Sequence, residues 1–302
     1  MTIAGFHIRM ALLLAGFVVA TAIVSAAAGI HVQDAVSLLV AVLLVTAGLS
    51  PIPAYAHQSG RIGLRESSAA LLWALAFAVV LPLSVEALGR LGRPLQDAHF
   101  AILDRSLGIS VPAIAGWAGR HTVGRALNFV YGLLIPWIPV AAFAVGLSGQ
   151  WLRARIFVAA NVIAFAIGLP LFVLFPAIGP WYGSALAPTA FQLQCQNSLL
   201  SLRAGGAPIA IGVVCFPSFH VVWAILCAYA FSGFRWLRIP GWLLGIAIIV
   251  STVTTGWHYF VDVLAGLVIA AIALRLARGL ATPHEDPANK VTTVFEPDSA
   301  VI

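Results

Sequence analysis

The chain has 302 residues, of which 61% are hydrophobic and only 9% are charged, whereas a soluble globular protein carries about 25% charged residues. There is too little polar side-chain surface here to cover a water-facing globule of this size, so the main solvent must be lipid. The net charge of +6 does not indicate nucleic-acid binding, because the basic residues lie between apolar runs without an aromatic-and-basic stripe, and three cysteines are too few for a disulfide framework.

Charge-free apolar stretches predict an all-α fold, a polytopic integral membrane bundle of about eight transmembrane helices. In chain order these lie at about 10–30, 35–55, 68–88, 126–148, 156–176, 218–234, 240–257 and 259–277. The first stretch reaches the roughly 20 residues that a bilayer requires, so we interpret it as a retained span and not as a signal peptide. Pro170 and Pro176 are expected to kink or end the fifth span.

The basic residues predict the orientation of these spans. Placing the N-terminus, and therefore also the C-terminus, in the cytoplasm puts most of them inside, while the remaining six fall outside: Arg90, Arg93, Arg105, Arg120, Arg125 and Arg203. Five of the six lie in the segment 89–125, which is too polar for a full span and includes a short helix-like stretch from Ser110. Two interpretations stay open for this segment: a loop that touches lipid headgroups, or a group of arginines that faces a phosphate.

Two short segments place ionisable groups at the ends of apolar helices. The first, 216–220, reads FPSFH and puts His220 at the outer end of the sixth span, just after a proline suited to a first helical turn. The second, 256–262, reads GWHYFVD and puts His258 and Asp262 four residues apart, where the two side chains can touch. Ionisable groups in apolar helices are costly and indicate a functional site.

The predicted topology brings His220 and His258 to the same membrane face. Both lie at helix N-termini, where backbone N–H groups and the helix dipole favour an anion such as phosphate. His258 can then attack phosphorus, Asp262 can hold the other ring nitrogen of His258, and His220 can protonate the leaving oxygen. No metal or cofactor is expected, because this face offers no cluster of carboxylates or cysteines that would hold one.

These segments resemble two motifs of the type 2 phosphatidic acid phosphatase superfamily. Residues 217–220 are similar to its Pro-Ser-Gly-His motif, with Phe219 in place of glycine, and Ser251, His258 and Asp262 have the spacing of its Ser-Arg-x5-His-x3-Asp motif. The resemblance covers roughly residues 95–275. It implies a phosphohistidine mechanism with His258 as the nucleophile, Asp262 as the residue that orients it and His220 as the acid.

The chain departs from the superfamily pattern at two cationic positions. Its Lys-x6-Arg-Pro motif is absent, since Glu86 stands where the lysine would precede Arg93-Pro94, and Thr252 replaces the arginine of the last motif. The pattern is closer to the inositol phosphorylceramide synthase-like, or inositolphosphotransferase, branch, which the stretches 103–108 and 202–205 also resemble. Arg203 is a candidate replacement ligand for phosphate, together with Ser218 and Ser251, although Ser218 fits a helix cap equally well.

The sequence therefore predicts three parts: N-terminal transmembrane helices (1–94), a catalytic membrane domain of phosphatase or phosphotransferase type (95–278) and a polar, disordered cytoplasmic tail (279–302). The expected function is that of a lipid phosphatase or phosphotransferase in the cell (inner) membrane, with an extracytoplasmic site. Its partners would be the bilayer and a membrane lipid substrate. The lipid, the acceptor and the oligomeric state are left open.

Two other functions remain alternatives at this point. The histidines and the aspartate would also suit a transporter that uses them as an ion relay, and the missing cations are compatible with a catalytically inactive relative. Asp97 and Asp104 are interpreted as loop residues that pair with Arg93 or Arg105. Whether Cys195 and Cys215 form a disulfide in the outer loop is also open.

Overall fold

The computed structural model describes residues 3–27, 47–48, 50–91, 93–206 and 215–281, and within these ranges the chain is all-helical with no strand. The twelve named helices are α1 (Ile3–Ala27), α3 (Pro51–Gln58), α4 (Ile62–Gly89), α5 (Asp97–Ser106), α6 (Val111–Gly119), α7 (Thr122–Gly132), α8 (Leu134–Leu147), α9 (Trp151–Leu174), α10 (Ala190–Arg203), α11 (Phe219–Phe231), α12 (Arg238–Thr254) and α13 (Phe260–Ala281). The predicted all-α class is confirmed for this part of the chain.

Helices lie at seven of the eight predicted spans, whereas the second, 35–55, falls largely outside the described residues. Among the described helices, three are long and apolar enough to cross a membrane: α1, α9 and α13. The bent pair α7–α8 makes a fourth if it is counted as one span, and α11 and α12 are shorter apolar helices. These helices support an integral membrane protein; the number eight and the orientation stay predictions.

The break between α7 and α8 divides the predicted span 126–148. The two helices meet at Leu133 with a bend of 40°. Pro136 explains the break, because a proline has no N–H to donate and its ring clashes with the carbonyl four residues earlier, which here belongs to Gly132. By contrast, α9 continues through Pro170 and ends at Leu174, two residues before Pro176.

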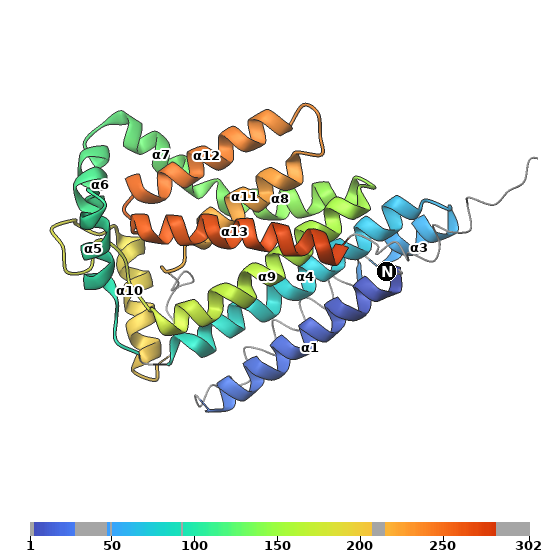
Figure 1. Ribbon diagram of the computed structural model, residues 1–302, viewed down its shortest axis with the longest axis horizontal. Coiled ribbons are helices and arrows are strands. Elements are labelled where there is room, and N and C mark those ends of the chain that lie inside the picture. The colour runs from blue at the N-terminus through green and yellow to red at the C-terminus, as the bar shows by residue number, and fades with distance from the viewer. Residues whose placement is uncertain (1–2, 28–46, 49, 92, 207–214, 282–302) are drawn as a thin grey trace, which may run out of the picture.

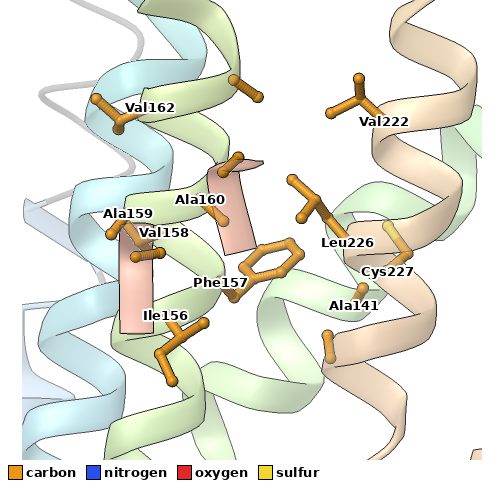
Figure 2. Packing of buried hydrophobic residues seen from close by; sticks show 14 of the residues in the cluster. Ala141, Ile156, Phe157, Val158, Ala159, Ala160, Val162, Val222, Leu226 and Cys227 are labelled. Carbon is orange, nitrogen blue, oxygen red and sulfur yellow. The ribbon is translucent and has the colours of Figure 1, made fainter. Parts of the chain in front are cut away.

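The long helices α4, α9 and α13 run side by side along the molecule, and α1 packs along α4 (Figure 1). On the other side of α9, α11 packs against α8, α12 and α13. The core between these helices is apolar: Phe157 of α9 projects toward Leu226 and Cys227 of α11 (Figure 2), and all three are almost fully buried. The short helices α5, α6 and α10 gather at one end, where α13 begins (Figure 1).

A glycine on α13 allows this helix to approach the start of α11. A Cβ atom added at Gly266 would lie 2.7 Å from the carbonyl oxygen of Ser218 and 2.9 Å from a side-chain atom of Val221. Only a residue without a side chain fits this contact. The approach brings Asp262, one turn earlier on α13, beside the first residues of α11.

A buried ionic cluster joins the N-terminal helices to α9 at the other end of the bundle. The carboxylate of Glu66 accepts hydrogen bonds from Arg155, from Arg65 and from Nε2 of His7, which is 3.1 Å away. Glu66 and Arg155 are each only 3% exposed. Since an unpaired charge at this depth would be costly, the pair holds α4 and α9 in register.

Candidate active site

Helix α11 begins with a cap that also connects it to α13. The hydroxyl of Ser218 accepts a hydrogen bond of 3.4 Å from the backbone N–H of Val221, and the Ser218 N–H donates to the carbonyl oxygen of Asp262 at 3.2 Å. Ser218 is therefore a helix cap in this structure, which was one of its two interpretations. His220 follows within the first turn, and the cap fixes where its side chain leaves the helix.

The chain reverses between α12 and α13 in a tight turn that ends at His258. The backbone N–H groups of Trp257 and His258 both donate to the carbonyl oxygen of Thr252, at 3.1 and 3.2 Å. Gly256 has a φ angle of +73°, a conformation that strongly favours glycine. The turn sets His258 just before α13, where the residue is only 3% exposed.

The Nδ1 atom of His258 lies between two hydrogen-bond acceptors. It is 2.9 Å from the carbonyl oxygen of Cys215 and 3.5 Å from Oδ2 of Asp262. Because both neighbours accept, they favour the neutral tautomer in which Nδ1 carries the proton and Nε2 has the lone pair. That tautomer is the one a nucleophilic histidine needs.

The carboxylate of Asp262 is completely buried and held from several sides. Its Oδ2 accepts the backbone N–H of Tyr259 at 2.8 Å and lies 3.1 Å from Sγ of Cys215, whereas Oδ1 has no hydrogen-bond partner among the described atoms. Burial raises the pKa of the Cys215 thiol well above its ordinary range, so the thiol keeps its proton and donates a hydrogen bond to Asp262. These contacts fix the carboxylate beside the His258 ring.

The two histidines converge as the topology predicts. The ring centroids of His220 and His258 are 5.6 Å apart, with their planes at 54°. A separation of this size allows one phosphate group to contact both imidazoles. His220 is partly exposed whereas His258 is buried, so any ligand would meet the site from the His220 side.

Tyr131, at the end of α7, is a site residue that no sequence pattern indicates. Its ring stacks on that of His220, with centroids 4.2 Å apart and planes at 12°, and its hydroxyl oxygen is 3.3 Å from Nδ1 of His220. The same ring also stacks with Trp257, at 5.8 Å and 4°. No charge or motif marks this tyrosine, and only the packing of α7 against α12 brings it to the site.

Two aspartates of α5 hold the turn that carries His258. Asp104 accepts the backbone N–H groups of Phe260 and Val261 at 2.9 and 3.0 Å, and Asp97 accepts the Tyr259 hydroxyl at 3.1 Å. Asp97 also accepts the backbone N–H groups of residues 178 and 179. Burial raises the pKa of both carboxyl groups, and these donated hydrogen bonds oppose the shift.

These contacts correct two sequence-based expectations. Asp97 and Asp104 do not pair with Arg93 or Arg105 in the hydrogen bonds described; they bind backbone N–H groups instead. In addition, we expected the N-terminus of α13 to be available to a phosphate. Its first N–H groups instead bind the carboxylate of Asp104, so this helix end already has an anion. The sequence cannot reveal such a partner because it lies 156 residues earlier in the chain.

The candidate phosphate ligands have contacts of their own. The guanidinium group of Arg203 donates to the carbonyl oxygen of Arg93, and Arg90 donates to that of Gly205 at 3.1 Å. The hydroxyl of Ser251 donates to the carbonyl of Ile248 within its own helix, at 2.6 Å. Phosphate binding by Arg203, Ser218 and Ser251 therefore stays a prediction.

A cavity of about 430 Å³ lies on the α5 side of the His258 turn. Its polar lining includes Asp97, Asp104, Arg105, Ser110, Tyr182 and Tyr259, whereas the two histidines are not part of it. Arg105 is thus the one predicted outer arginine that lines this cavity, which is also lined by Tyr259, the residue that follows His258.

The cysteines answer a question that the sequence left open and bear on the metal prediction. None of the three, all of which the structure describes, forms a disulfide. The ligand atoms of Cys215, His258 and Asp262 all lie within 4.8 Å of one another, a grouping that has the donor types of a metal site. The reason given for metal independence, the lack of such a cluster at this face, is therefore wrong, and metal independence itself stays a prediction.

An apolar helical fold with two converging histidines and a buried aspartate defines a membrane protein with a histidine-based site. Residues 98–276 match the family model of the PAP2 superfamily. The match spans more than half of the chain, so the protein belongs to the PAP2 superfamily, whose members are phosphatases. No curated protein and no solved structure matches the chain. The matched range lies within the predicted catalytic domain, 95–278, and the superfamily prediction is confirmed.

Proposed function

We propose that the protein is a membrane enzyme that removes or transfers a phosphoryl group of a lipid phosphate at the extracytoplasmic face, through a phosphohistidine at His258. The observation that supports this most strongly is the pair of imidazoles, 5.6 Å apart, with different neighbours. His258 faces two acceptors, one of them the buried carboxylate of Asp262, and His220 faces a neutral hydroxyl. This difference fits a nucleophile and an acid, respectively.

In the first step, the Nε2 lone pair of His258 attacks phosphorus. The bond from phosphorus to the leaving oxygen breaks, and the oxygen keeps the electron pair of that bond. The same oxygen takes a proton from Nε2 of protonated His220. The positive charge that develops on the His258 ring is stabilised by the Asp262 carboxylate, 3.5 Å from Nδ1. Asp262 does not need to accept the proton, because holding Nδ1–H already fixes the tautomer.

The second step regenerates the enzyme. His220, now neutral, removes a proton from the incoming nucleophile, whose oxygen attacks phosphorus while the P–N bond breaks and its electron pair returns to Nε2 of His258. Water as the nucleophile gives a phosphatase. A lipid or polyol hydroxyl gives a phosphotransferase of the inositolphosphotransferase kind, and the same three residues serve both reactions.

A phosphate in this site also requires positive charge, because the superfamily cations at two positions are absent from the sequence. We propose that Arg203 and at least one of the arginines of the segment 89–125 supply it, with Ser218 and Ser251 as further ligands. Arg105 is the favoured member of that segment because it lines the cavity next to the His258 turn. The extracytoplasmic location rests on the distribution of basic residues, and the cell membrane is the proposed location.

A direct test offers the purified protein a panel of lipid phosphates, with and without hydroxyl acceptors, while released phosphate and new phospholipid products are both measured. Turnover of at least one lipid, lost in His258→Ala, is the expected result. Phosphate release alone would identify a phosphatase, and a new phospholipid would identify a transferase. If no member of the panel is turned over, or if His258→Ala is as active as the wild type, the proposed function is wrong.

A further inference from the structure

Three buried side chains of different chemistry meet on the Nδ1 side of the His258 ring. Oδ2 of Asp262 is 3.1 Å from Sγ of Cys215 and 3.5 Å from Nδ1 of His258, and the ligand atoms of the three residues all lie within 4.8 Å of one another. The ligands of a tetrahedral Zn²⁺ ion are about 3.3–3.6 Å apart, because each lies about 2.0–2.3 Å from the metal. The measured distances are therefore close to those of three metal ligands.

A second observation also indicates a ligand at this place. Oδ1 of Asp262 is buried and has no hydrogen-bond partner among the described atoms. A buried carboxylate oxygen without a partner is costly, and a bound cation would remove that cost. In addition, the carbonyl oxygen of Cys215 is 2.9 Å from Nδ1 of His258, so a further oxygen lies beside the same group.

The donor types select the kind of cation. Mg²⁺ and Ca²⁺ prefer sites built from oxygen atoms alone, whereas a thiolate and an imidazole favour thiophilic ions such as Zn²⁺ and Cd²⁺. The charge also fits a divalent ion. A thiolate and a carboxylate carry two negative charges, which balance the two positive charges of the metal, so the buried complex has no net charge.

Binding such an ion changes the protonation of His258. The thiol of Cys215 releases its proton to solvent, and the thiolate gives an electron pair to the metal. The proton of the His258 ring moves from Nδ1 to Nε2, and the freed lone pair of Nδ1 binds the metal, since metal and proton take opposite ring nitrogens in a neutral imidazole. One proton leaves the protein for each ion bound.

We propose that Cys215, His258 and Asp262 form an inhibitory site for a thiophilic divalent cation. The ion binds Nδ1 of His258 and places the ring proton on Nε2, which then has no lone pair with which to attack phosphorus. The ion also takes the Asp262 carboxylate away from the imidazole that it orients. The inhibition rests on the proposed function, whereas the binding of the metal does not.

The first test measures binding without any turnover. Cd²⁺ is titrated into the purified full-length protein, and the ultraviolet charge-transfer absorption of the cadmium–thiolate bond is followed. We expect one ion per chain in the wild type, with an apparent Kd that falls about tenfold for each pH unit, because one proton is released. Cys215→Ala should lose this absorption. Cys227→Ala should keep it, since Cys227 is equally buried but packs in the apolar core.

Asp262→Asn provides a second variant in case Cys215→Ala does not fold, which thermal unfolding reports. The amide keeps the size of the side chain but removes its charge, so Cd²⁺ should bind at least about tenfold more weakly. The site is rejected if the wild type shows no thiolate absorption, or if Cys215→Ala or Asp262→Asn, when folded, binds Cd²⁺ as the wild type does.

The second test measures inhibition in the wild type and in Cys227→Ala with p-nitrophenyl phosphate. Cd²⁺ should lower kcat at least about tenfold at saturation, with half of the effect at the concentration that gives half of the absorption change. EDTA should restore the rate, and Mg²⁺ should have no effect. A kcat that stays constant or rises while the absorption reports a bound ion would overturn the inhibition. If the proposed function itself is wrong, the phosphate esters are not turned over, yet the absorption still appears in the wild type and is lost in Cys215→Ala.

Discussion

Asp104 provides a sharp test of how the site is held together, because it is far from His258 in sequence and yet binds the first residues of α13. Its carboxylate accepts the N–H groups of Phe260 and Val261 at 2.9 and 3.0 Å and is 3% exposed. In Asp104→Ala both N–H groups lose their partner and α13 loses the anion at its N-terminus. A lost helix cap costs about 0.5–2 kcal/mol, and hydrogen bonds to a charged group contribute about 1.5–3 kcal/mol.

Taking the middle of these ranges, the free energy of unfolding should fall by about 2–3 kcal/mol, which corresponds to a lower Tm by roughly 5–10 °C. The rate should fall as well, because the freed turn carries His258. The assay is thermal unfolding in detergent followed by tryptophan fluorescence, together with kcat at a temperature where the variant is folded. Ser106→Ala, on the same helix, removes only an exposed hydroxyl bonded to the carbonyl of Leu103 and serves as the control. An Asp104→Ala protein with the Tm and kcat of Ser106→Ala would refute the reasoning.

Further predictions concern the chemistry. His220→Ala should lose most of its rate with a lipid phosphate and recover in part with p-nitrophenyl phosphate, whose leaving group needs no proton, so equal losses with both substrates would contradict the role of His220 as the acid. Asp262→Asn should keep the fold but lose about two to four orders of magnitude in kcat, because the amide can favour the wrong tautomer of His258; a kcat within tenfold of the wild type would count against this role. Dialysis against a chelator should leave the activity unchanged, and a loss that Zn²⁺ restores would instead indicate a metal held by Cys215, His258 and Asp262.

The sequence was sufficient for the parts of the fold and site that depend on local patterns. Helices lie at seven of the eight apolar runs, and the spacing of His258 and Asp262 predicted a contact that the structure has, at 3.5 Å. The break in α7–α8 was missed because hydropathy does not register that Pro136 prevents a continuous helix. The composition was enough to indicate lipid as the solvent, since it depends on no long-range contact.

The contacts that position the site could not be predicted from the sequence, because they join residues that are far apart in the chain. Tyr131 and His220 are 89 residues apart, and Asp104 and Phe260 are 156 residues apart. Neither pair has a periodic signal, and each depends on how separate helices pack. The same holds for Glu66 and Arg155, which also lie 89 residues apart and form a buried ion pair. The sequence marks such residues only as polar groups in apolar surroundings.

The central claim, a phosphoryl group carried by His258, can be tested by trapping the intermediate. The purified wild type and the variants His220→Ala and His258→Ala are mixed with a lipid phosphate or with p-nitrophenyl phosphate, each labelled with ³²P. The reactions are stopped in base, which preserves phosphohistidine, and the protein is digested for mass spectrometry. The account predicts label on the peptide that contains His258, more of it in His220→Ala when an aryl phosphate is the donor, and none in His258→Ala. Turnover without label on His258, or label on another residue that persists in His258→Ala, would contradict it.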